Sequence, residues 1–207
     1  MRIVGVVPGA KLFGSEDLYA DHYLFVNGYP KRIAACGGTG RAEAKIEALR
    51  DAVAAAEEVA FTAAVRADVG GEEFCCTLRC TGTAEGCTAE VLSPELIAGV
   101  TAQLSPGGAE IGFGGVSLPL ALSGAPDLSP LAAAGLTADA LRFGSVRRAW
   151  TERDAEGNAV CAAELYVTDA AELTLRFGGE TFAPLSAELS VDGAVRAVCE
   201  ISDFSYK

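Results

Sequence analysis

The sequence has few of the residues that most often carry catalysis or bind metals. His22 is the only histidine among 207 residues, and it lies in the N-terminal 40 residues, whose composition differs from the rest, so no Ser/His/Asp set is expected. Cysteines occur at positions 75, 76 and 80 without a histidine beside them. On a strand these side chains alternate between opposite faces, which is the wrong geometry for zinc. We therefore expect no enzyme, no cofactor and no metal site.

Positive charge is also scarce, with 16 Lys and Arg against 28 Asp and Glu and a net charge of −12. This balance excludes nucleic acid and anionic membrane surfaces as electrostatic partners. The sequence also lacks an apolar run of eighteen residues, so it predicts no transmembrane helix. A membrane association would then require a lipid anchor.

Cysteine is present in an odd number, seven, and without zinc spacing, which favours buried free thiols over a disulfide framework. Cys80 and Cys87 are the exception, because they flank a predicted turn at 81–86. Direct cross-strand pairing would bring them within bridging range. Their disulfide state stays open at this stage.

Alternation with a period of two dominates the middle of the chain and predicts strands. The connections between them are short and rich in Gly, Pro and Ser, so neighbouring strands should be antiparallel. The predicted strands are 59–69, 72–81, 87–92, 99–104 and 109–113. They form a meander with one apolar face.

Helix-like spacing of apolar residues flanks this meander at 41–58 and 130–143. A weak strand is expected at 116–122, and a second meander at 146–154, 160–167, 172–177, 185–191 and 195–202. We predict an α+β fold that is mostly β. A long curved antiparallel sheet of ten or eleven strands should form a half-barrel, with two helices on its concave face.

Residues 1–40 differ in composition from the rest, since they hold four basic and three acidic residues while 41–207 hold 12 and 25. A strand at 2–7 and an interrupted helical stretch at 21–27 and 29–36 predict a short α/β-like appendage. We therefore divide the chain into residues 1–40 and a half-barrel domain, 41–207.

Three segments of this appendage, 3–8, 21–25 and 32–38, resemble the opening of class I glutamine amidotransferase-like peptidases of the gamma-glutamyl hydrolase type. The Gly-x-Cys-x-Gly elbow and the His-x-Glu pair of that family are absent. The resemblance therefore implies at most an inactive remnant of such a peptidase.

Residues 33–38, Ile-Ala-Ala-Cys-Gly-Gly, also resemble a bacterial lipobox, in which Cys36 would carry the lipid anchor. A lipobox needs an apolar segment directly before it, and residues 26–32 do not provide one. The protein would thus be extracytoplasmic in the cell envelope if Cys36 marks a lipoprotein start, and cytoplasmic as the sequence is written. A chimeric join at 33–38 and a natural N-terminal extension are alternative explanations.

The order of elements across 41–207 resembles the bacterial lipoprotein-carrier (LolA-like) family and its lipid-binding lipoprotein relatives. The most similar segments are 173–189 and 201–204, although Gly178-Gly179 stands where an Asp is usual. The resemblance implies a monomer that binds or carries a hydrophobic small molecule or lipid in its concave face. A structural or interaction module with a filled core is the alternative. The candidate ligand contacts are the apolar residues of that face: Phe61, Val65, Phe74, Leu78, Val91, Val100, Ile111, Phe113, Leu175, Phe177 and Leu189.

Overall fold

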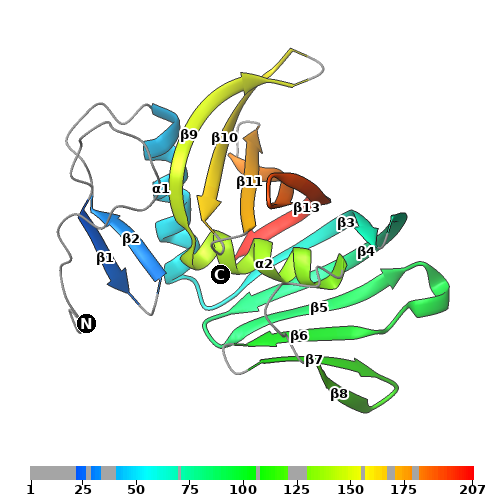
Figure 1. Cartoon of the computed structure of the whole chain (residues 1–207). Coiled ribbons are helices and arrows are strands. Elements are labelled where there is room, and N and C mark those ends of the chain that lie inside the picture. The colour runs from blue at the N-terminus through cyan, green and yellow to red at the C-terminus, as the bar shows by residue number, and fades with distance from the viewer. Residues whose placement is uncertain are drawn as a thin grey trace.

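The structure is a computed structural model (Figure 1). It describes residues 22–26, 29–33, 41–69, 71–105, 108–120, 130–154, 157–166, 171–178 and 182–207. Structural statements below concern these residues. The predicted strand at 2–7, the lipobox-like segment and Cys36 lie outside them.

One open antiparallel sheet of eleven strands organises the molecule, in the order β8-β7-β6-β5-β4-β3-β13-β12-β11-β10-β9. The first meander provides β3 (Val59–Val69), β4 (Glu72–Thr83), β5 (Gly86–Ser93), β6 (Thr101–Ser105), β7 (Gly108–Phe113) and β8 (Val116–Leu120). The second provides β9 (Ser145–Arg153), β10 (Ala159–Tyr166), β11 (Ala171–Gly178), β12 (Ala183–Val191) and β13 (Ala194–Tyr206). The expected mostly β half-barrel is confirmed.

The two meanders join at the centre of the sheet, where β3 pairs with β13. Ala67 lies opposite Ala197, and Val65 lies opposite Cys199. Alternate residues on both strands are buried on the same face, as period-2 alternation requires. The concave face is therefore apolar across the join, and one core serves both meanders.

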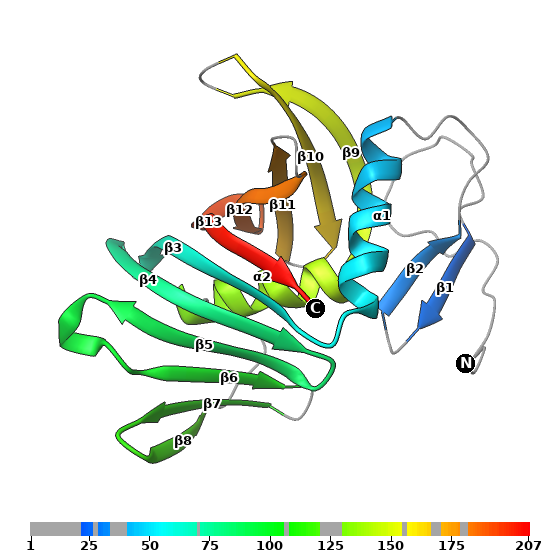
Figure 2. The same cartoon turned by 180° about the vertical axis from the view of Figure 1, so that it is seen from behind.

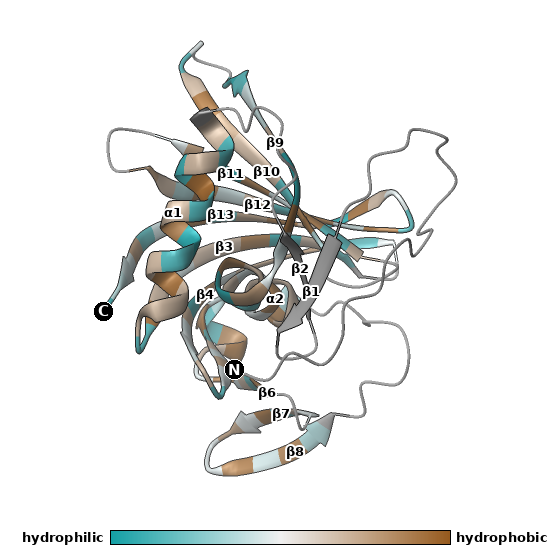
Figure 3. Cartoon of the chain, turned by 90° about the vertical axis from the view of Figure 1, so that its left-hand side faces the viewer, coloured by the Kyte–Doolittle hydropathy of each residue, from teal (hydrophilic) through white to brown (hydrophobic). Residues whose placement is uncertain are grey.

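Both helices lie on the concave side of the sheet (Figures 1 and 3). Helix α1 (Arg41–Ala55) packs against β9 and β10, and α2 (Pro130–Phe143) packs against β3 to β6 and β13. They contact each other through two buried arginines. Arg50 donates to the carbonyl of Gly144, and Arg142 Nη2 donates to the carbonyl of Ala56 at 2.9 Å. These bonds fix the corner between the helices.

Small residues let α2 approach the sheet closely. A Cβ added at Gly135 of α2 would lie 1.9 Å from Cδ1 of Leu104 on β6. On β4, a Cβ at Gly82 would lie 3.0 Å from Cγ1 of Val59 and 3.2 Å from Cβ of Ala138. The helix is thus in van der Waals contact with the strands beneath it, and larger residues at these positions would push it away.

The expected helical stretch in the N-terminal segment is wrong. Instead, β1 (His22–Val26) pairs with β2 (Tyr29–Ile33) in antiparallel register, with Val26 opposite Tyr29. Gly and Pro at positions 28 and 30 disfavour a helix, and Asn-Gly between two strands is the strongest short hairpin signal. The pair lies beside α1 and β9 (Figures 1 and 2). The helix that the amidotransferase resemblance required is therefore replaced by a hairpin.

The direct cross-strand pairing that would bring Cys80 and Cys87 within bridging range does not occur. The hairpin between β4 and β5 is tighter than predicted, because Thr83 lies opposite Gly86. Cys80 consequently lies opposite Ala89, and Cys87 opposite Gly82, so the two thiols are offset by two residues. Both cysteines are free.

Candidate functional site

Seven of the predicted ligand contacts lie in the core beneath the helices. Each has at most 2 % of its surface exposed: Phe61, Val65, Leu78, Val91, Leu175, Phe177 and Leu189. They belong to one cluster with buried residues of both helices, including Ile46 of α1 and Ala134 of α2. A side chain with so little accessible surface borders no void that could hold water. The helices therefore fill this part of the concave face.

The other four predicted contacts are less buried. Phe74 lies near the outer end of β4 and is 36 % exposed. Val100 and Ile111 are half-buried, and Phe113 at the end of β7 is 59 % exposed. Val100, Ile111 and Phe113 lie close to one another. Val100 directly precedes β6, and β6 pairs with β7, the strand that carries Ile111 and Phe113. They mark the end of the concave face that lies beyond α2.

A continuous row of apolar side chains links the core to this end. Successive strand pairings place six residues opposite one another: Phe61, Cys80, Ala89, Ala102, Ile111 and Leu118. The first four are buried, Ile111 is half-buried, and Leu118 on β8 is 64 % exposed. Burial therefore falls along one row of the same face as it leaves the cover of α2.

Four apolar residues form what we call the uncovered strip: Ile111, Phe113, Val116 and Leu118. They share the concave side, because Ile111 lies opposite Leu118 and Phe113 lies opposite Val116. Val116 is 65 % exposed. The hairpin that carries them lies at the far end of the sheet from α1 in each view (Figures 1, 2 and 3). Exposed apolar side chains gathered on one face are typical of a binding surface.

Two members of the strip, Val116 and Leu118, are not among the ligand contacts predicted from the sequence. A signal was present, since Val116, Leu118 and Leu120 alternate with Ser117 and Pro119 directly after a Gly-Gly pair. The strand at 116–122 was expected but not assigned to a face. Its register with β7 shows that face.

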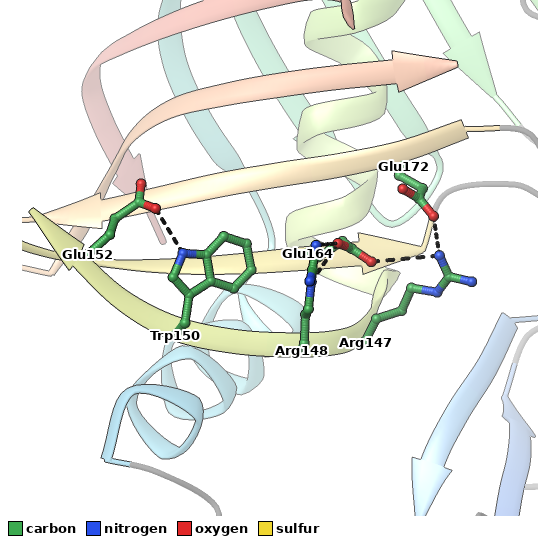
Figure 4. A network of polar contacts seen from close by, with 6 residues as sticks. All are labelled: Arg147, Arg148, Trp150, Glu152, Glu164 and Glu172. Atoms are coloured by element: carbon green, nitrogen blue, oxygen red, sulfur yellow. Dashed lines mark hydrogen bonds and ion pairs between the residues drawn. The ribbon is translucent and has the colours of Figure 1, made fainter. Parts of the chain in front are cut away.

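The outer face of β9 to β11 carries a polar network (Figure 4). A β-bulge in the pairing of β9 with β10 leaves Arg147 and Arg148 both within reach of Glu164. Arg148 Nε donates to Glu164 at 2.7 Å, and Arg147 also pairs with Glu172. The carboxylates and guanidiniums neutralise one another, which suits a structural role better than acid–base catalysis.

Trp150 and Glu152 extend this network along β9. Trp150 Nε1 donates to Glu152 at 2.8 Å, and Arg176 Nε of β11 donates to the same carboxylate at 2.7 Å. These two donors lower the pKa of Glu152 below its usual value. The buried side chains of Val160 and Ala162 lie on this face of β10, so the network covers a small apolar patch.

A hollow of about 440 Å³ lies on the outer face, where β3, β4 and β13 meet. Its lining includes Arg66, Cys75, Thr77 and Glu200. The hollow is on the opposite side of the sheet from the uncovered strip, so the two are separate surfaces.

Burial lowers the reactivity of four concave-face thiols, those of Cys76, Cys80, Cys87 and Cys199. It raises the pKa of Cys76 to about 11 and those of Cys87 and Cys199 to about 12. The pKa of Cys80 is raised for the same reason.

Across the described ranges, no group of three or more His, Cys, Asp or Glu side chains could hold a metal ion. In the same ranges, neither helix is long and apolar enough to cross a bilayer.

Comparisons with known proteins give similarity of fold. No protein-family model matches the sequence, and no curated protein matches it significantly. Solved structures with a similar fold include a LolA superfamily protein from Nitrosomonas europaea, with 16% identity, a TM-score of 0.45, and coverage of 82% of this chain and 94% of that one. Another is a protein domain from Vibrio parahaemolyticus named for outer membrane lipoprotein sorting, with 13% identity, a TM-score of 0.41, and coverage of 81% and 94%. LprF from Mycobacterium bovis has 12% identity, a TM-score of 0.39, and coverage of 80% and 93%. The amidotransferase resemblance of residues 1–38 receives no support.

Proposed function

We propose that this protein is a non-enzymatic binder or carrier of a long hydrophobic molecule, such as the acyl chain of a lipid, on its concave face. The apolar row that runs from the buried core to the exposed Leu118 is the observation that supports this proposal. A hydrocarbon chain laid along the uncovered strip would remove several exposed apolar side chains from water, which is favourable. The strip is thus the first contact for the ligand.

The strip differs from the originally predicted cavity in one respect. The residues beneath α2 are already covered, so a chain could extend under the helix only if α2 moved away from β6. The small residues Ala89 and Ala102 lie along that path and leave room once the helix has moved. We therefore propose that binding begins at Ile111, Phe113, Val116 and Leu118, and that the seven core residues contact a ligand only after such a movement.

A second candidate is a structural or interaction module with a filled core. The near-complete burial of seven predicted contacts favours it. In that case the strip would have no affinity for free hydrocarbon chains. The two candidates therefore differ in one measurable property.

We propose a location in the bacterial cell envelope, on the condition that Cys36 marks a lipoprotein start and follows a true signal peptide. This placement rests on the lipobox-like sequence at 33–38. A genomic reading frame that encodes an apolar segment directly upstream of Cys36 would support it, and residues 1–35 would then be foreign to the mature protein.

The experiment is a titration with a fluorescent fatty acid. Wild type should bind the probe, and Leu118→Asp should weaken binding at least about tenfold, because a carboxylate in contact with the chain must lose its hydration. Val195→Asp is the matched control, since Val195 is 51 % exposed but lies elsewhere on the sheet. It should leave binding unchanged. Absence of probe binding by wild type, or equal losses in both variants, would overturn the proposal.

A further inference from the structure

We propose that the tip of the β7–β8 hairpin is a contact element for an uncharged lipid bilayer surface. The proposal rests on the proposed function only in that the hairpin also carries the uncovered strip. Phe113 and Val116 flank the Gly114-Gly115 turn and are more than half exposed. They are thus the apolar residues nearest the tip of the hairpin.

The half of the hairpin nearest the tip is uncharged in a chain that is otherwise rich in charge. Residues 111–120 contain no Asp, Glu, Lys, Arg or His, whereas 21% of the chain is charged. Exposed strands in water usually carry charged side chains, which limit aggregation. The side of the hairpin opposite the strip presents Gly112 and Ser117, which are small and uncharged. Neither face of the tip would therefore leave a charge in the interfacial region of a bilayer.

Charge also decides which bilayer suits the hairpin. The chain carries a net charge of −12, and Glu110 at the base of β7 is exposed. An anionic surface would repel the protein as a whole, whereas a zwitterionic surface would not. Insertion of the tip would then depend on apolar area and not on electrostatic attraction.

Addition of a further strand to the exposed edge of β8 is disfavoured. Pro119 lies within β8 opposite Glu110, and proline has no N–H to donate to a neighbouring strand. β8 is also only five residues long. These features limit pairing with a second copy of the chain or with an extended peptide, so the apolar side chains and not the strand edge provide the contact surface.

The direction of the strip links this contact to ligand binding. Phe113 and Val116 lie at the tip, and Ile111 and Leu118 are the next pair along the same face toward the base. A hydrocarbon chain leaving a bilayer in contact with the tip would meet Ile111 and Leu118 without crossing a charged residue. The hairpin would thus form an apolar path between the bilayer and the concave face.

The test measures flotation of the ligand-free protein with phosphatidylcholine vesicles. Wild type should float with these vesicles, and about tenfold less should float with the double variant Phe113→Ser and Val116→Ser. A matched double variant, Leu185→Ser and Val195→Ser, removes two exposed apolar side chains elsewhere and should behave as wild type. Replacement of some lipid by phosphatidylglycerol should lower the bound fraction of wild type.

Fatty-acid titration of the same proteins separates this proposal from the proposed function. Wild type that binds the fatty acid but not vesicles would overturn the bilayer contact and leave the carrier proposal standing. Wild type that binds vesicles but no fatty acid would overturn the carrier proposal and leave the bilayer contact standing. Equal vesicle binding by both double variants would overturn the assignment to the tip. A concentration-dependent dimer that the tip substitutions abolish would also overturn the proposal, because a second copy of the chain and not a bilayer would then cover the tip.

Discussion

The contact between Gly135 of α2 and Leu104 of β6 sets the boundary between the covered and uncovered parts of the concave face. Substitution Gly135→Ala tests it, because the added Cβ would lie 1.9 Å from Cδ1 of Leu104. Leu104 would have to change rotamer, or α2 would have to rise from the sheet. The same contact therefore controls whether the helix could move to admit a ligand.

Two opposing effects determine the size of the change in stability. Alanine is favoured over glycine within a helix by about 1 kcal/mol. Overpacking of a well-filled contact costs roughly 1–3 kcal/mol. The single variant Gly135→Ala should therefore be destabilised by roughly 0–2 kcal/mol. In a Leu104→Ala background the clash is absent, and the same substitution should stabilise the protein by about 1 kcal/mol.

The measurement is urea unfolding of wild type, both single variants and the double variant, followed by circular dichroism. The coupling between the two sites should be roughly 1–3 kcal/mol. If Gly135→Ala changes the free energy of unfolding equally in both backgrounds, α2 does not rest on Leu104. The boundary of the uncovered strip would then have to be drawn elsewhere.

Three further predictions concern the core, the polar network and the thiols. Phe177→Ala should lower the free energy of unfolding by roughly 3–5 kcal/mol, because Phe177 is fully buried, whereas Leu185→Ala at a half-exposed position should cost less than about 1 kcal/mol in the same urea titration. Glu152 has a folded-state pKa below the ordinary 4.5, so its carboxylate should stabilise the fold at neutral pH and lose this effect as the pH falls through the lowered pKa. Glu152→Gln should flatten that part of the curve of unfolding free energy against pH. An unchanged curve would contradict the polar network. Iodoacetamide at about pH 8 should label the exposed Cys75 rapidly in the native protein, as mass spectrometry would detect. Rapid native labelling at any of four buried thiols would contradict their placement: Cys76, Cys80, Cys87 and Cys199.

Local patterns were sufficient to predict most of the sheet and α2. The helix at Pro130–Phe143 begins with proline at its first position and ends before Gly144, so its bounds follow from local preferences. The strands follow from period-2 alternation on a sheet with one buried face. The helix predicted at 41–58 ends earlier, at Ala55, and lies on β9 and β10.

Local patterns could not predict which residues of the apolar face lie beneath α2 and which lie beyond it. Phe61 and Phe113 both alternate with polar or small residues on their strands, yet Phe61 is buried and Phe113 is exposed. The difference arises because α2 packs mainly on β3 to β6, and tertiary packing decides that placement. The β1–β2 pair was missed for another reason, since residues 21–27 and 29–36 were interpreted as an interrupted helix and the Asn-Gly signal between two short strands was not used.

The pairing of β3 with β13 has a consequence for how the chain assembles. Within each meander, neighbouring strands are also neighbours in sequence, so each half can form from local contacts. The join between the halves instead pairs Ala67 with Ala197 and must wait until β13 has been synthesised. Contacts so distant in sequence form slowly, and until then β3 and β12 each present an open edge. A polypeptide that stops before residue 194 would thus leave two unjoined half-sheets with exposed edges. The strand that is synthesised last, β13, is therefore the one that protects the nascent protein from aggregation.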